Sequence, residues 1–483
     1  MRGQSIVWVC CIAAWGCFQP TAWAREDHSD VRAEIVGDAF VHSEIYENLR
    51  HLCDGIGGRM SGMESGDRAQ AYALRKFEEY GLQGVHKEAF PLQAWRRGQV
   101  AVRVYGPSVQ RSLAAVALGN VGSTPGDGLD AELIDVGHGD PAEFEALGPE
   151  IKGKITLVDE GSLPGKRSLH RSEKAALSAK YEALAMLHIA QGPDGLPRTG
   201  TACLGGLADI AAAAIPEEDG AWVRRLLDRG HGLRVLMTMT NEAFQAEAAN
   251  IVGDIPGSAS PQEVVLVGAH LDSWDLGTGF VDNGTGVGVV LEVARLLGGV
   301  NERPKRTIRC VLFMAEELGS LGSQAYVDRH SDELDDLAMA VNLDMVGTPR
   351  GYAVHGHPEA NAFLGSLAEK LCGFDLSPEI SNGVGLNSDH VSFLLRGVPT
   401  MTVNSDLEDN MGRHYHTATD TFDKIVRKSL VECSAVVAIT LFELADAEDR
   451  IAQRLSRDQL RDLLVKNNLR EALEASGLWS FGD

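Results

Sequence analysis

Residues 263–291 read EVVLVGAHLDSWDLGTGFVDNGTGVGVVL, an apolar strand pattern followed by a helical pattern. The run 263–269 has the length and the β-branched content of a buried strand, and from about Gly284 apolar residues recur at helical spacing. Strand and helix patterns alternate after it, which is typical of an α/β sandwich with a mainly parallel sheet. Strands are expected near 307–314, 338–345 and 398–403, and helices near 320–329, 360–371, 391–396 and 428–446.

Polar side chains follow the first of these strands, where α/β sheets bind ligands beyond the carboxyl ends of their strands. His270 ends the strand, Asp272 comes shortly after it, and Asp282 precedes the helix. Asp272 is expected to accept the second ring N–H of His270 and so fix its tautomer. An ordinary polar loop explains these three residues equally well, so a metal site depends on segments further along the chain.

Three later segments carry side chains that suit a metal. Glu316 and Glu317 follow the apolar strand 309–314, and there one carboxylate can bind a metal while the other takes a proton. Asp344 ends another buried-type strand, where an unpaired carboxylate is costly. His416 lies in the segment YHTATDT. Each segment also has an ordinary explanation, as surface charge or as a helix cap.

Together these residues suit two zinc ions that share one bridging carboxylate. Ions of this kind lie roughly 3.5–4 Å apart in two-metal hydrolases, generate hydroxide near neutral pH and polarise a carbonyl. Glu316 would act as the general base. Asp389 and His390 either cap a short helix or face the same site. The candidate ligands are His270, Asp282, Glu317, Asp344 and His416.

Composition argues against two kinds of partner. The 483 residues carry a formal net charge of -24, which disfavours nucleic acid and anionic membrane surfaces. A hydrophobic content of 44% and a charged content of 23% are ordinary for a globular protein, and the length predicts two domains. Outside the first residues no C-x-x-C pair occurs, so a structural zinc site made of thiolates is not expected.

Residues Met1–Ala24 resemble a secretory signal peptide. Arg2 precedes a short apolar core, and Ala22-Trp23-Ala24 is a small-x-small cleavage site. The core is too short to span a bilayer, and no later segment reaches that length without charges. We therefore predict an exported protein, secreted or periplasmic, that is not integral to the membrane. A lipid anchor on Cys17 is the alternative.

The chain is predicted to have four parts. Residues 1–24 are the signal peptide. The Pro/Gly-rich segment 119–128 opens a region with its own strand and helix rhythm and without the metal-type residues, so 119–246 is predicted to be an inserted domain. The catalytic domain is then discontinuous, at 35–118 and 247–449, and a charged helical tail covers 450–483.

At these motifs the sequence resembles the di-zinc exopeptidase family of aminopeptidases and glutamate carboxypeptidases, and within it the plasma glutamate carboxypeptidase branch. The resemblance covers roughly Glu44 to Asp446. The combination of motifs is specific, although each motif alone is not. The motifs are IGGR at 56–59, HLDSWD at 270–275, DNG at 282–284, EE at 316–317, NLD at 342–344, SDH at 388–390 and HT at 416–417.

The resemblance implies a fold and an assembly. The fold would be a three-layer α/β sandwich with a mixed, mainly parallel sheet, and the insertion would be a protease-associated-like domain over the cleft. Family members often have a cis peptide bond after the bridging aspartate, here Asp282-Asn283, and a homodimer is a further implication. Two residues depart from the family pattern: Asn283 stands where close relatives often have Asp, and Phe280 is large enough to narrow the approach to the site.

The resemblance also implies a role for each site residue. One zinc would be held by His270 and Asp344, the second by Glu317 and His416, and both by Asp282. The catalytic residues would be Glu316, as general base, and Asp272, as the support of His270. Substrate or supporting contacts would come from Asn283, Asp389 and His390.

Three functions fit these residues. A secreted di-zinc exopeptidase that acts on dipeptides or short peptides with free termini fits best. A glutaminyl-cyclase-like acyltransferase would use one zinc, and a non-catalytic binding homologue would have lost ligands. The sequence leaves open which terminus is recognised, because Arg396, Arg413 and Asp389 all lie near site motifs.

Overall fold

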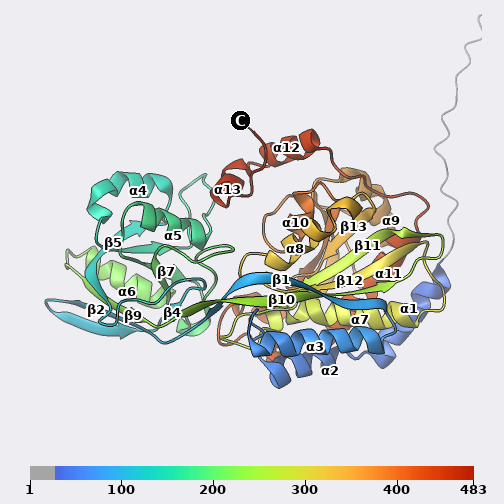
Figure 1. Cartoon of the computed structure of the whole chain (residues 1–483), viewed down its shortest axis with the longest axis horizontal. Helices are drawn as coiled ribbons and strands as arrows, with labels where there is room; N and C mark the ends of the chain where they lie inside the picture. The colour runs from blue at the N-terminus through green and yellow to red at the C-terminus, as the bar shows by residue number, and fades with distance from the viewer. Residues whose placement is uncertain (1–27, 483) are drawn as a thin grey trace, which may run out of the picture.

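The computed structural model describes residues 28–482, so the predicted signal peptide lies outside the described residues. Within them the chain forms two separate sheets (Figure 1). The central strands of the first sheet are parallel, and antiparallel strands flank them on both sides. Its seven strands follow the order β1 (Gln83–Arg96), β10 (Glu242–Ile255), β12 (Arg306–Phe313), β11 (Ser260–His270), β13 (Leu337–Asn342), β15 (Thr400–Asp406) and β14 (Thr348–Val354).

Helices cover both faces of this mixed sheet. α7 (Thr285–Gly299) and α11 (Arg427–Asp446) pack together on one face and are buried around most of their circumference, which explains their nearly continuous apolar sequences. α8 (Leu321–Arg329) and α10 (His390–Leu394) cover the other face, where their aromatic rings meet Phe313 of β12. The remaining helices of this unit are α1 (Ser29–His42), α2 (Ile45–Arg50), α3 (Glu64–Glu79) and α9 (Asn361–Lys370).

The second sheet belongs to a unit of its own, at the left of Figure 1. Its eight strands follow the order β3 (Val109–Leu113), β2 (Val100–Gly106), β9 (Arg234–Met239), β5 (Leu129–Gly137), β6 (Ile155–Asp159), β7 (Ala185–Ala190), β8 (Ala211–Pro216) and β4 (Val116–Ala117). Strands β5 to β8 are parallel to one another. Its helices are α4 (Pro141–Leu147), α5 (Arg171–Lys180) and α6 (Glu217–Leu227).

The predicted boundary at 118/119 falls inside this second sheet. Strands β2, β3 and β4 all pair within it, so the chain leaves the first unit where β1 ends, at Arg96, and returns at Glu242, where β10 begins. The alternating valines of β2 predict a strand but cannot indicate which of two sheets the strand joins. The insertion therefore runs over 97–241 rather than 119–246.

Aromatic side chains and one arginine join the two units. Trp95 at the end of β1 donates its indole N–H to the carbonyl of Val121, at 2.8 Å. The Arg97 guanidinium lies over the rings of Trp95 and Trp274, 4.8 and 5.6 Å from their centroids, and pairs with Asp275 at 2.9 Å. Trp274 and Asp275 follow the end of β11, so the joint adjoins the segment that carries the predicted ligands.

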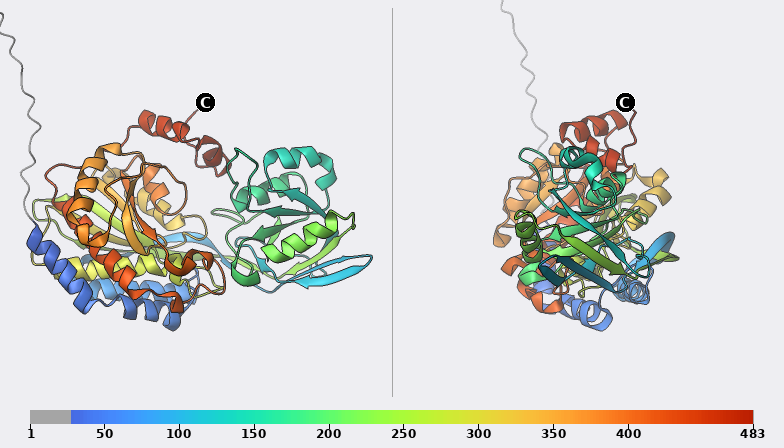
Figure 2. Two further views of the ribbon diagram at one scale, coloured as in Figure 1. Left: turned by 180° about the vertical axis from the view of Figure 1, so that it is seen from behind. Right: turned by 90° about the vertical axis from the view of Figure 1, so that its left-hand side faces the viewer.

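The C-terminal tail forms two short helices, α12 (Arg457–Lys466) and α13 (Arg470–Ala475). Figure 1 and the left-hand view of Figure 2 show it crossing from the first unit toward the second. Among residues 28–482, none of the helices combines the length and apolar character that a membrane crossing requires. The cysteines in this part of the chain are free thiols, and Cys310 is buried in β12.

Candidate metal centre

Three neighbouring parallel strands end at the same edge of the first sheet. β11 ends on His270, β12 ends shortly before Glu316 and Glu317, and β13 ends just before Asp344. Because the carboxyl ends of parallel neighbours meet at one edge, these side chains converge. Asp282 comes from the turn before α7 and reaches the same point.

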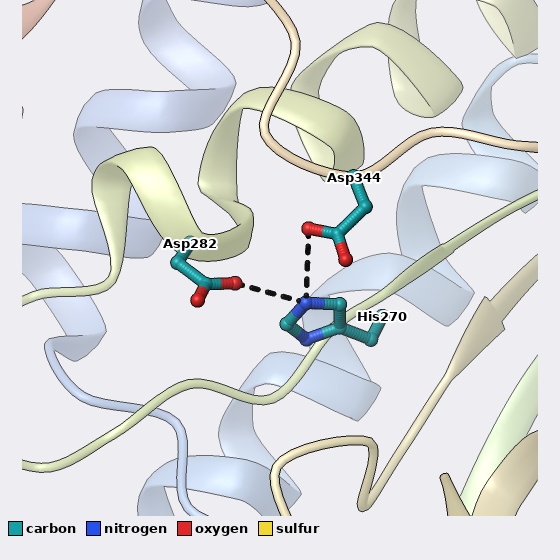
Figure 3. A group of neighbouring side chains, drawn as sticks. All are labelled: His270, Asp282 and Asp344. Carbon is teal, nitrogen blue, oxygen red and sulfur yellow. Dashed lines mark ion pairs between the residues drawn. The ribbon is translucent and has the colours of Figure 1, made fainter. Parts of the chain in front are cut away.

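The five predicted ligands form two triads that share Asp282, and within each triad the ligand atoms lie within 4.8 Å of one another. In the first triad, Nε2 of His270 lies 3.0 Å from Oδ1 of Asp282 and 3.4 Å from Oδ1 of Asp344 (Figure 3). In the second, Nε2 of His416 lies 2.9 Å from Oδ2 of Asp282 and 3.0 Å from Oε2 of Glu317. Each oxygen of Asp282 thus faces a different imidazole.

The donor set fits zinc, which binds histidine nitrogens and carboxylate oxygens in proteins. Oε1 of Glu317 and Oδ1 of Asp344 are buried without a hydrogen-bond partner, as expected for atoms that await a cation. Burial raises the pKa of Glu317 to about 7, with the Asp282 charge adding to the rise. Burial lowers the pKa of His270, but Asp344 and the other nearby carboxylates overcome it and hold that pKa well above its usual value. A cation would relieve this concentration of negative charge.

Asp272 supports the site differently from the prediction. The backbone carbonyl of Asp272, not its carboxylate, accepts from Nδ1 of His270, at 3.1 Å, whereas the carboxylate lies 3.6 Å away. Its carboxylate instead accepts the backbone N–H groups of Glu316, at 3.1 Å, and of Glu317, at 3.3 Å. Asp272 therefore fixes the His270 ring through its main chain and the two glutamates through its side chain.

Asn283 links the two segments that carry the carboxylates of the first triad, Asp282 and Asp344. The Asp282-Asn283 peptide bond is cis, as the family resemblance implies. The Asn283 amide donates to the carbonyl of Leu343, at 2.8 Å, and its oxygen accepts from Met345, at 3.1 Å. These two residues flank Asp344. The residue is fully buried, so it supports the ligands and does not meet the substrate.

A cleft of about 1450 Å³ opens over the triads and lies between the two units. Asp282, Glu316 and His416 line its floor, and α5 of the second unit lines a wall. Two backbone hydrogen bonds tie the insertion to the ligand segments. Thr199 donates to the carbonyl of His416, at 3.0 Å, and Gly205 donates to the carbonyl of Leu318, at 2.8 Å.

Comparison with known proteins agrees with this geometry. Residues 250–441 match Peptidase family M28. Carboxypeptidase Q of Bos taurus is 31% identical over 84% of this chain and 86% of its own length. The chain belongs to peptidase family M28. The family resemblance is thereby confirmed, and so is its plasma glutamate carboxypeptidase branch, for which carboxypeptidase Q is another name.

Two solved structures are similar to this M28 chain. A peptidase M28 precursor from Shewanella amazonensis SB2B is 26% identical, with a TM-score of 0.78 over 89% of this chain and 99% of that chain. A zinc aminopeptidase from Bacillus subtilis is 25% identical, with a TM-score of 0.65 over 85% and 97% respectively. The mixed α/β architecture is therefore shared with other M28 peptidases.

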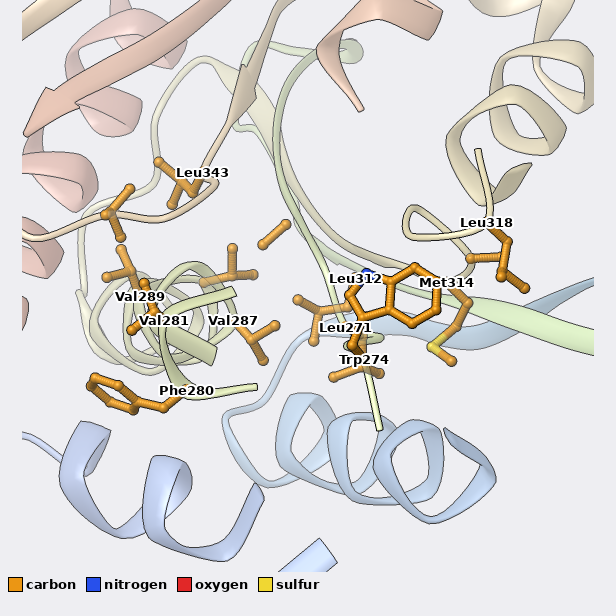
Figure 4. Packing of buried hydrophobic residues seen from close by; sticks show 14 of the residues in the cluster. Leu271, Trp274, Phe280, Val281, Val287, Val289, Leu312, Met314, Leu318 and Leu343 are labelled. Carbon is orange, nitrogen blue, oxygen red and sulfur yellow. The ribbon is translucent and has the colours of Figure 1, made fainter. Parts of the chain in front are cut away.

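Phe280 and His390 of the M28 chain lie away from the triads, whereas Asp389 occupies the N-cap position of α10 and its charge acts on Glu316. Phe280 is fully buried and packs edge-on against Phe422, 6.0 Å between centroids, so it does not narrow the cleft (Figure 4). His390 is the first residue of α10, and its ring stacks on the ring of His355 with 4.4 Å between the centroids, so it packs against His355. Asp389 is also fully buried, both carboxylate oxygens lack a hydrogen-bond partner, and burial raises its pKa to about 7.

Two buried charged residues that the sequence analysis missed hold the segment between His270 and Asp282. Arg59 is fully buried and donates to the carbonyls of Leu271, Thr278 and Gly279, at 2.7, 2.7 and 2.8 Å. Asp420 accepts the backbone N–H groups of Val281 and Asp282, at 2.6 and 3.2 Å. Arg59 lies in the quoted motif IGGR, but nothing in that motif indicates which carbonyls it reaches.

A third missed residue lies on the insertion. Arg171, the first residue of α5, lines the cleft, and its Nη2 lies 3.3 Å from Nδ1 of His416. The insertion was expected to contribute no side chain to the metal-type constellations. Sequence alone gives no signal for this contact, because it depends on how the two units are placed together.

Proposed function

We propose that this M28 chain is a zinc-dependent exopeptidase that uses two zinc ions to hydrolyse dipeptides and other short peptides with free termini. The observation that carries the proposal is the pair of triads that share Asp282 on the floor of a cleft. The similar proteins support the reaction class, since they are named carboxypeptidase Q and zinc aminopeptidase.

Zinc held by the two triads would supply Lewis-acid activation of the scissile carbonyl and of the attacking water. Glu316 is partly exposed on the cleft floor and is the residue positioned to accept a proton and return it to the leaving amine. Burial raises the pKa of Glu316 well above its usual value, and the charges of Asp389 and Glu317 raise it further. Adjacent cations lower such a pKa again, toward the range that suits proton transfer near neutral pH.

Arg171 supports recognition of a free carboxylate. A neutral imidazole that binds a metal through Nε2 carries its proton on Nδ1, and is then a donor there. Arginine has donors only, so with metal present Arg171 cannot hydrogen-bond to the His416 ring that it adjoins. Its Nη1 lies 2.9 Å from Nε2 of His170, so Nε and Nη2 are the donors that remain for a carboxylate, the acceptor that arginine matches best. We assign the terminal carboxylate of the substrate to Arg171.

The test is amino-acid release from one dipeptide offered free, N-acetylated and C-amidated, with zinc supplied. The free form should be cleaved, and the C-amidated form should be cleaved far more slowly. Arg171→Gln should raise KM for the free form about 10- to 100-fold, since a hydrogen bond to a charged group contributes about 1.5–3 kcal/mol. Zinc content, measured in parallel, should not change.

Arg396→Gln is the matched control, because Arg396 also lines the cleft but pairs with Asp328. It should leave KM unchanged. An unaltered KM in Arg171→Gln refutes the carboxylate assignment alone. Failure of the wild-type protein to cleave any form, together with cyclisation of an N-terminal glutamine, would replace the exopeptidase proposal by the acyltransferase alternative.

We also propose that the protein is exported, on the basis of the signal-like sequence 1–24. N-terminal sequencing of protein recovered outside the cytoplasm should begin at Arg25. Recovery of a chain that begins at Met1 and stays in the cytoplasm would contradict export. A lipid-modified N-terminus at Cys17 would favour the anchored alternative.

A further inference from the structure

The C-terminal tail (residues 455–482) is attached to the first unit through α12. Leu460 and Leu464 of α12 are buried against Leu394 of α10. Partly buried side chains of the segment 384–386 pack around the same cluster. That segment leads into residues that line the cleft, so the tail is attached next to the catalytic floor.

Beyond α12 the tail extends toward the second unit (Figure 1 and the left-hand view of Figure 2), and side chains of this part of the tail line the cleft. Leu473 is the buried residue of α13, and Leu478 and Trp479 fold back so that their backbone N–H groups donate to its carbonyl. The cleft-lining residues of this part of the tail are Glu471, Ala472, Leu473, Ala475, Ser476, Leu478 and Ser480.

The opposite wall of the same cleft is α5 and the segment that precedes it. Small side chains line this wall, namely Ala176, Ala179 and Ala183. Arg167, also on this wall, pairs with Glu173, whose carboxylate raises the pKa of the guanidinium, and the charge of Glu471 on the tail adds to that rise. Arg167 on the insertion and Glu471 on the tail thus carry opposite charges on two walls of the cleft.

Resting on the proposed exopeptidase function, we propose that the tail is a wall of the substrate cleft and restricts the enzyme to short peptides. The triads lie on the floor, α5 forms one wall and α13 forms another. An extended peptide lengthens by about 3.3–3.6 Å with every residue. A substrate with its scissile bond on the floor therefore meets α13 or α5 after few residues, and a longer chain has to pass between them.

Two variants test this restriction from opposite directions. Deletion of 467–483 removes α13, and with it Leu473 of the buried cluster, but keeps Leu460 and Leu464 of α12. Ala475→Trp adds bulk at an exposed, cleft-lining position and leaves the rest of the tail intact. Val465→Trp is the matched control, because Val465 is 49% exposed on α12 and does not line the cleft.

The readout is kcat/KM for a series of peptides from two to six residues. The deletion should raise the value for the hexapeptide at least tenfold relative to the dipeptide, with the dipeptide value nearly constant. Ala475→Trp should lower kcat/KM for peptides of three and four residues. This decrease should be several-fold larger than the decrease for the dipeptide. The same dependence on length in the wild type and both variants would overturn the proposal.

A second readout does not depend on hydrolysis. Cys203 is a partly buried free thiol in the cleft, and Cys372 is an exposed thiol that Cys372→Ser removes from the background. Maleimides carrying polymers of increasing size should label Cys203 faster after the deletion, and the gain should grow with reagent size. Unchanged labelling would show that the tail does not wall the cleft, even if the protein proves not to be an exopeptidase.

Discussion

Replacement of the buried Arg59 should weaken both the fold and metal binding. The guanidinium satisfies three carbonyls in the segment 271–279, which joins His270 to Asp282. Arg59→Met preserves most of the side-chain volume but leaves these buried carbonyls without donors, at about 1–3 kcal/mol each. Relief of the buried charge offsets part of this loss. The free energy of unfolding should fall by about 3–5 kcal/mol, which is the cost of three unpaired carbonyls less the relief of the buried charge.

Arg59→Lys should lower the free energy of unfolding by an intermediate amount, because a single ammonium group cannot reach all three carbonyls as the planar guanidinium does. Urea unfolding followed by tryptophan fluorescence measures the change, and zinc affinity should fall roughly 10- to 100-fold as the ligand segment loosens. Arg96→Met is the control, because Arg96 is 58% exposed and pairs with exposed Glu242. This substitution should lower the free energy of unfolding by less than about 1 kcal/mol. If Arg59→Met resembled this control in both stability and zinc affinity, the reasoning would be refuted.

The remaining predictions concern proton transfer, metal content and pH. Glu316→Gln should lower kcat about 10²- to 10⁴-fold with unchanged zinc content; full turnover would remove Glu316 as the base. Asp282→Asn should deplete both triads of zinc, whereas Asp344→Asn should deplete only the triad of His270, as metal analysis after dialysis can show. Burial lowers the pKa of His188 to about 3, so the unfolded chain binds its proton first. Stability should therefore decline as pH falls from about 6.5 toward 3, by up to about 1.4 kcal/mol per pH unit from this residue, and His188→Leu should flatten that part of the profile in urea titrations.

The ligand set could be predicted because its signal is local. Each of His270, Glu317 and Asp344 follows an apolar strand, and parallel neighbours bring such residues to one edge of the sheet. The role of Asp272 was only partly predictable. Its spacing in the sequence placed it beside His270. Only the structure shows that its backbone carbonyl accepts from the His270 ring while its carboxylate accepts from the backbone N–H groups of the glutamates.

What the sequence could not show depends on long-range placement. β8 is composed largely of alanine, the strongest helix former, yet it forms a strand because it is covered on both faces within the second sheet. Arg171 and Arg59 reach partners that lie 245 and more than 200 positions away along the chain. No periodicity or motif reports such a contact, so both residues emerge only from the assembled structure.

The insertion has a consequence for biosynthesis. β1 pairs with β10, and residues 97–241 separate them in the chain. β1 therefore stays unpaired with β10 during synthesis until the whole second unit has been made. Every residue of the two triads follows in the chain, from His270 to His416. During synthesis from the N-terminus, the second unit can fold first as an independent domain. The metal centre then forms among the last parts of the enzyme, so an incomplete chain has no peptidase site.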